Sequence, residues 1–372
     1  MSAPYLKWIL GQQNQHSPAK CGVFFARLKK LAHRQITYKN KPLTIHKARI
    51  NPHFNEKTIL VTSTWDYIGL WMRRNHKLEA DFYWQQAKHF YHATTELPKN
   101  SSPLTAYYCM LNATKAFLLA KGVNFSDQHG VSGRREAGRT CLSNEIVKFK
   151  AGGILAELCR YLGETANNEE YTLQNLLYNL PYIHRAFDLS YESTSELFIP
   201  IKNPRIVRSR RTDESWFCAE LEHKYANMTT VNKLPTHFER DSSITDSFTI
   251  RSTRRFNWTP SQKTASLQRY RNYHQSLRND LCYIYSPQRL WYLKRRANGD
   301  RYINRSSLTV TFASMHKLSE LARYAPNILS KHFESRYNWL LSEFISIAPL
   351  QFIDELSSEL TGYEFMPPGR QH

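Results

Sequence analysis

The chain of 372 residues is 41% hydrophobic and 13% aromatic, and it contains only 13 glycines and 16 prolines. This composition is typical of a folded globular protein and excludes collagen-like, low-complexity and largely disordered classes. Because 51 lysines and arginines outnumber 31 aspartates and glutamates, the formal net charge is +20, which indicates an anionic partner.

The sequence also bears on location and cofactors. No apolar run reaches the roughly 18 residues that a membrane-spanning helix needs, and residues 1–11 lack the pattern of a signal peptide. We therefore expect a cytoplasmic protein with no membrane partner. The six cysteines are widely spaced, and no known nucleotide-binding or metal-binding motif occurs, so the sequence predicts reduced thiols, no metal and no cofactor.

The first two segments differ in charge and periodicity. Residues 1–79 carry a net charge of +11, and we interpret them as a basic N-terminal arm of mixed structure. Residues 80–195 are nearly neutral and are predicted to form a helical bundle. In this bundle the segment 104–121 is apolar on nearly all sides, as in a buried central helix. The other helices are predicted over residues 79–97, 142–163 and 170–187.

The last two segments complete the predicted fold. Residues 196–310 alternate β-rich runs with basic clusters, which predicts a small antiparallel β insert, and positions 201–310 of this segment carry a net charge of +12. The dipeptide Asn298-Gly299 predicts a hairpin over residues 289–305. Helical periodicity returns over 311–372, and we expect these C-terminal helices to pack back on the bundle. The predicted fold class is thus α+β, mainly α.

Polar residues near the predicted central helix are candidates for a site. Asn112 and Lys115 lie three residues apart and therefore on one face of the helix, and His129 follows in a polar loop. Since burial of an isolated ammonium costs several kcal/mol, Lys115 must be paired, extend to solvent or lose its proton. These residues are interpreted either as structural caps or as part of a ligand site.

The same residues carry a resemblance to a known family. The helix Tyr107–Ala116 (YYCMLNATKA), the following His129-Gly130 and the segment LARYAP at 321–326 resemble the pattern of the YaaC-like proteins. The helices also resemble those of the HEPN superfamily. The resemblance implies a HEPN-like helical bundle, with one shared site formed by Tyr108, Asn112, Lys115, His129 and Arg323.

The HEPN resemblance also implies a function. Many HEPN relatives cleave or bind RNA in phage defence, so the chain is expected to bind RNA or DNA in a bacterial anti-phage system. It would act as a metal-independent ribonuclease or as the recognition subunit for a nuclease encoded nearby. The R-x4–6-H motif of HEPN ribonucleases is matched at Arg27–His33 and at Arg269–His274, both outside the predicted bundle, which leaves enzymatic activity open.

Arginine clusters in the β insert are predicted to bind nucleic acid. Arginine forks match phosphates, and interleaved tryptophans would stack on unpaired bases. The predicted residues are Arg208, Arg210, Arg211, Arg251, Arg254, Arg255, Trp258 and Trp291. Two other functions fit the same sequence: a non-catalytic scaffold whose basic faces bind an acidic protein, and a nucleotide or small-molecule sensor that uses the Asn112, Lys115 and His129 cluster.

Overall fold

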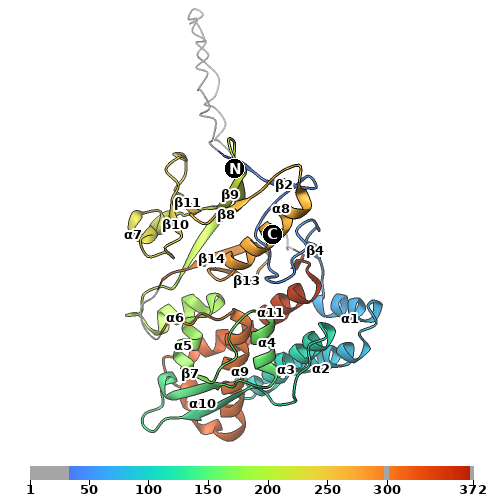
Figure 1. The fold of residues 1–372 in the computed structure, drawn as a ribbon. Coiled ribbons are helices and arrows are strands. Elements are labelled where there is room, and N and C mark those ends of the chain that lie inside the picture. Colours follow the sequence, from blue (N-terminus) through green and yellow to red (C-terminus); the bar gives the residue numbers. More distant parts are fainter. Residues whose placement is uncertain (1–32, 297–300, 369–372) are drawn as a thin grey trace, which may run out of the picture. The chain divides into compact units, whose positions relative to one another are not determined.

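The computed structural model describes residues 33–296 and 301–368, which form both helices and sheets, with more residues in helices than in strands (Figure 1). The helices are α1 (Thr64–Arg74), α2 (Leu78–Glu96), α3 (Ser102–Ala120), α4 (Ile154–Tyr161), α5 (Leu173–Tyr178), α6 (His184–Ser190), α7 (Met228–Val231), α8 (Lys263–Leu277), α9 (Ser307–Tyr324), α10 (Pro326–Phe333) and α11 (Asn338–Thr361). The strands are β1 (His33–Gln35), β2 (Thr37–Tyr38), β3 (Lys41–Pro42), β4 (Ile59–Leu60), β5 (Val131–Arg135), β6 (Glu145–Phe149), β7 (Glu169–Thr172), β8 (Phe198–Ser209), β9 (Glu214–Glu220), β10 (Phe238–Arg240), β11 (Thr249–Ser252), β12 (Phe256–Asn257), β13 (Leu281–Ile284), β14 (Leu290–Lys294) and β15 (Phe365–Met366). No helix in these ranges is both long enough and apolar enough to cross a membrane.

Helix α3 lies at the centre of the helical part. It packs against α2, α9 and α11. Small residues such as Ala113 and Ala116 allow close approach, while Tyr107 and Phe117 fill the space between the helices, and all four side chains are buried. Because α3 is surrounded, its sequence is apolar on nearly all sides.

An eight-stranded antiparallel sheet forms the second part of the described chain. Its strands follow the order β10-β11-β9-β8-β14-β13, with β1 paired to β8 and β12 paired to β9. Strand β8 is 12 residues long and joins the two halves of the sheet, because one end pairs with β14 and the other with β9 and β1. Helix α8 covers one face, where Tyr270, Tyr273 and Leu277 belong to the same buried cluster as Phe217 and Ile250.

The prediction of a mainly α fold with a HEPN-like bundle and a small β insert is therefore wrong. The chain is a mixed helix and sheet protein whose large sheet has a core of its own. Two signals misled the prediction. Strand β8 contains the partly buried Arg205 and Arg208 among its apolar residues, and α8 has so few apolar residues that its helical period is hidden.

The bundle predicted over 80–195 also contains strands. Residues 142–163 form β6 and α4 rather than one helix, and β5, β6 and β7 make a three-stranded antiparallel sheet. The break comes at Gly153, which has φ 101° and whose added Cβ would lie 2.6 Å from the carbonyl oxygen of Gln128. A residue with a side chain would be strained there.

The turn of the predicted hairpin, Asn298-Gly299, lies outside the described residues. Within the described chain, β14 pairs with β13 and β8.

The helical part and the large sheet meet along a polar face of α11. The amide of Gln351 donates to the carbonyl oxygen of Tyr283 on β13 and accepts from the backbone N–H of Tyr285. The ammonium of Lys47, from the segment before α1, lies 2.9 Å from Asp354. Each of these α11 side chains is buried. This junction is therefore held by buried polar contacts rather than by apolar packing alone.

Candidate functional site

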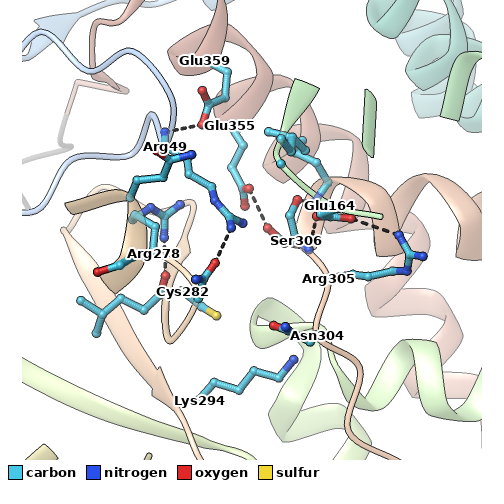
Figure 2. A pocket seen from close by; sticks show the side chains of 18 of the residues that line it. Arg49, Glu164, Arg278, Cys282, Lys294, Asn304, Arg305, Ser306, Glu355 and Glu359 are labelled. Carbon is cyan, nitrogen blue, oxygen red and sulfur yellow. Dashed lines mark hydrogen bonds and ion pairs between the residues drawn. The ribbon is translucent and has the colours of Figure 1, made fainter. Parts of the chain in front are cut away.

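A polar cavity of about 490 Å³ opens at this junction (Figure 2). Its walls come from the segment before α1, the end of α4, the end of α8, the strands β13 and β14, the start of α9 and the last turns of α11. Pockets of 300–1,000 Å³ between subdomains are the usual location of small-molecule sites. The charged residues on its walls decide what it can hold.

Three carboxylates line the cavity, and protein donors already engage each of them. Glu359 accepts the backbone N–H groups of Arg49 and Ile50, the second at 3.2 Å. Glu355 accepts from Gln351 and, at 2.6 Å, from the hydroxyl of Ser307. Burial raises the pKa of both carboxyls. These acceptors hold the walls of the cavity together.

The third carboxylate, Glu164, closes the start of α9. It accepts from the backbone N–H of Ser306 at 2.6 Å and from the hydroxyl of Thr309 at 3.0 Å. The guanidinium of Arg305, only 3% exposed, lies 3.3 Å from Glu164 and 2.9 Å from Glu169. Glu164 and Arg305 therefore hold the N-terminal end of α9 in place.

The cations of the cavity, in contrast, keep unused donors. Arg49 donates to Asn279, and Arg278 donates to the carbonyl oxygens of Leu281 and Lys47, but the buried Nε of each arginine has no partner among the described residues. The two guanidinium groups are close enough for Arg278 to help lower the pKa of Arg49, although burial is the larger cause.

Lys294 supplies a third cation from β14. Its Nζ donates to the carbonyl oxygen of Ile303 at 2.6 Å and lies 4.5 Å from the centre of the Tyr302 ring. An ammonium has three N–H groups, so one remains for another acceptor. Burial lowers the pKa of Lys294 to about 8. In Figure 2 its ammonium points toward Asn304.

The cavity thus presents spare donors and occupied acceptors. Buried donors without acceptors are rare in proteins, and buried cations favour an anionic partner. The described residues on the walls also include several amide and hydroxyl side chains and no aromatic ring. Such a lining suits a hydrophilic anion better than a flat heterocycle, which would find no stacking surface.

Comparison with protein families decides the classification. The model of the YaaC-like proteins matches residues 44–360, which include every cation and carboxylate described above. The chain belongs to the YaaC-like family. Comparisons with curated proteins and with solved structures give no significant match.

The polar residues that carry the YaaC-like pattern lie apart from the cavity. Arg323 on α9 donates to the hydroxyl of Tyr108 on α3 at 2.6 Å. The amide of Asn112 donates to the backbone of its own helix, and Lys115 lies 2.8 Å from Asp127. Within this pattern, Tyr108 and Arg323 therefore link α3 to α9, whereas Asn112 and Lys115 have local partners.

His129 instead joins an aromatic cluster between α3 and α9. Its ring lies 5.5 Å from Tyr107 and 5.8 Å from His316. Burial, followed by the charge of Lys115, lowers the pKa of His129, and burial lowers that of His316 to about 3. These histidines are neutral near pH 7 and fit a packing role.

The predicted nucleic-acid residues fall into an exposed and a buried group. Arg210, Arg211 and Arg254 are exposed at one end of the sheet, whereas Trp258 and Trp291 are buried in its core and present no stacking face. The other three arginines are partly buried: Arg208 contacts Asp213, Arg251 contacts Glu239, and Arg255 contacts the Trp216 ring.

The two R-x4–6-H matches do not form a site in the described residues. Arg269 donates to the carbonyl oxygen of Asn257, while His274, on the same helix α8, is fully buried with Nε2 3.1 Å from the backbone N of His46. Arg27 of the other match lies outside the described residues.

Sequence reasoning missed the cations of the cavity. Lys294 follows the apolar run of β14, and Glu355 and Glu359 lie four residues apart, as on an ordinary exposed face of a helix. The residues converge only through contacts between segments that are far apart in the chain, so their spacing in the sequence did not indicate a shared site.

Proposed function

We propose that this YaaC-like chain binds a small phosphorylated, hydroxyl-rich metabolite, such as a sugar phosphate, in the cavity. The observation that carries the proposal is that three cations, Arg49, Arg278 and Lys294, line one polar cavity whose carboxylates already accept hydrogen bonds from protein donors. Arginine forks and an ammonium are the usual protein partners of phosphate.

The lining narrows the class of ligand further. A volume of about 490 Å³ admits a small metabolite and excludes a macromolecule. Amide and hydroxyl side chains such as Asn272, Gln275 and Ser276 can pair with sugar hydroxyls. A nucleobase would lack an aromatic partner, so nucleotides should bind more weakly than sugar phosphates.

We expect the substitution Lys294→Gln to weaken binding of a phosphorylated ligand roughly ten- to hundredfold. A hydrogen bond to a charged group contributes about 1.5–3 kcal/mol, and this change removes one of them. The first measurement is a thermal-shift screen of hexose and pentose phosphates, with neutral sugars, inorganic phosphate and nucleoside monophosphates beside them. Affinities then follow from calorimetry of both proteins. Binding to the wild type should weaken as the pH rises through 8, where Lys294 loses its proton.

The matched control is Lys202→Gln, which removes an exposed lysine from the same sheet outside the cavity. It should leave the affinity unchanged. The proposal fails if no phosphorylated compound stabilises the wild type, or if Lys202→Gln and Lys294→Gln weaken binding equally.

A second candidate function is sequence-independent binding of RNA or DNA at the exposed end of the sheet. The pairing of Phe256 with Ser215 brings the segment of Arg254 and Arg255 beside the β8–β9 turn that carries Arg210 and Arg211. This convergence favours a surface that contacts phosphates. We do not extend this candidate to phage defence, because that role was inferred from the HEPN bundle, which the chain lacks.

For this surface, the double substitution Arg210→Glu and Arg211→Glu is expected to abolish a gel shift at low salt. The wild-type affinity should fall log-linearly with salt and differ little between sequences, since phosphate contacts release counterions. The double change Arg74→Glu and Lys77→Glu makes the same charge change at exposed positions near the end of α1 and should leave the shift intact. No shift with any RNA or DNA at low salt would remove this candidate.

A further inference from the structure

Three metal-ligating side chains converge on the large sheet, away from the cavity. They are His33 on β1, Cys218 on β9 and Asp241, which follows β10. A nitrogen, a sulfur and an oxygen from these side chains all lie within 4.8 Å of one another. The three residues are at most 4% exposed, so the cluster is closed from solvent.

One carboxylate oxygen of Asp241 has no hydrogen-bond donor among the described residues. Its Oδ1 accepts from the backbone N–H of Ser243 at 3.1 Å and from the Ser243 hydroxyl, as in an ordinary turn. Its Oδ2 is buried and has no hydrogen-bond partner among the described residues. A buried carboxylate oxygen without a donor is energetically costly. The unpaired Oδ2 therefore indicates that a bound ion or ligand is its partner.

We propose that His33, Cys218 and Asp241 bind a zinc ion that ties β1, β9 and the end of β10 together. Zinc prefers four tetrahedral ligands of this mixed type, at about 2.0–2.3 Å, which places the ligand atoms about 3.3–3.8 Å apart. Shifts of about 1.5 Å or less therefore complete the site. A water molecule supplies the fourth ligand. The role is structural because all three side chains are buried.

The charges around the cluster are compatible with a divalent cation. Two arginines flank Cys218 on the neighbouring strands, but each has its own carboxylate: Arg205 lies 2.8 Å from Glu220, and Arg251 lies 2.7 Å from Glu239. Arg251 is 3.7 Å from Asp241, too far for a hydrogen bond. Zinc would balance the thiolate and the carboxylate at shorter range than Arg251, whose nearest nitrogen is 3.7 Å from Asp241.

The first test is the metal content of the full chain, expressed with added zinc and then dialysed. About one zinc ion per chain is expected. Reconstitution with Co²⁺ should give the ligand-field bands of a tetrahedral site and a thiolate-to-cobalt charge-transfer band. Wild-type protein with no stoichiometric zinc and no such cobalt spectrum would overturn the proposal, and this result does not depend on any variant folding.

The second test uses Cys218→Ser and Asp241→Asn, which keep the side-chain shapes. Both should lose the bound zinc, and Cys218→Ser should also lose the charge-transfer band. The matched control Cys282→Ser, which removes a thiol from β13 of the same sheet, should retain both. Equal metal content in Cys218→Ser and Cys282→Ser would contradict the assignment of the ligands. Chelation should lower the melting temperature of the wild type and not that of Cys218→Ser.

Discussion

Replacing Lys47 by methionine is expected to lower the free energy of unfolding by about 3–5 kcal/mol, since removal of one partner leaves a buried charge uncompensated. The Lys47 ammonium donates to both carboxylate oxygens of Asp354 and to the carbonyl oxygen of Phe365, and it lies 4.3 Å from the centre of the Tyr283 ring. Both charged side chains are 2% exposed. Urea denaturation at pH 7, followed by tryptophan fluorescence, measures the change.

A double substitution separates the cost of an unpaired charge from the value of the pair. Lys47→Met with Asp354→Leu should recover most of the lost stability, because two apolar side chains replace two buried charges. The matched control Lys88→Met removes a partly exposed lysine paired with the exposed Asp66 and should cost less than about 1 kcal/mol. If Lys47→Met costs no more than Lys88→Met, the pair does not hold α11 to the segment before α1.

This pair also illustrates what the sequence could and could not predict. Helix α11 was predicted from its apolar period, which records the contacts with α3 and α9. Its polar side chains, including Gln351, Asp354 and Glu359, follow the same pattern as the solvent side of any surface helix. In the structure they are buried against β13 and the segment before α1. Periodicity reveals a polar face but not what covers it.

The large sheet was underestimated for a related reason. The β-rich runs were recognised, yet the basic residues between them suggested loops around a small insert. Arg205 and Arg251 are in fact strand residues, each paired across the sheet with a carboxylate. A strand that carries arginine on its outer face and apolar residues on its inner face gives only a short alternating signal. The extent of the sheet depends on pairing between distant strands, which composition does not encode.

The YaaC-like pattern was recognised correctly, but it did not locate the cavity. Of its polar residues, Tyr108 and Arg323 form a contact between α3 and α9, while Asn112 and Lys115 have local partners. The cavity residues Arg49, Arg278 and Lys294 come from three segments with no common motif. Motifs reveal residues that are close in sequence, whereas this site is formed by the junction of two folded parts. Only the folded chain brings its cations together.

Acid is expected to destabilise the protein through buried neutral histidines, of which His46 makes the clearest case. Its Nδ1 accepts the backbone N–H of Ala48 at 2.9 Å, so protonation would remove an acceptor as well as bury a charge. Burial lowers the pKa of His46 to about 4 and that of His274, whose Nε2 is 3.1 Å from the backbone N of His46, well below 6.5. The unfolded chain therefore binds more protons than the folded one between pH 6.5 and 4. Stability is retained above pH 6.5 and lost as the pH falls through this range.

For His46 alone, the loss amounts to about 3 kcal/mol, since each pKa unit corresponds to about 1.4 kcal/mol. The substitution His46→Asn keeps an acceptor near Ala48 but cannot take up a proton in this range. It should therefore shrink the difference between the unfolding free energies at pH 7 and pH 4.5 by about 2–3 kcal/mol. His92→Asn, at an exposed position of α2, is the matched control and should leave that difference unchanged. An equal pH dependence in the wild type and His46→Asn would show that this imidazole is charged in the folded state or does not contribute, and the acid sensitivity would then have to come from other buried histidines such as His274.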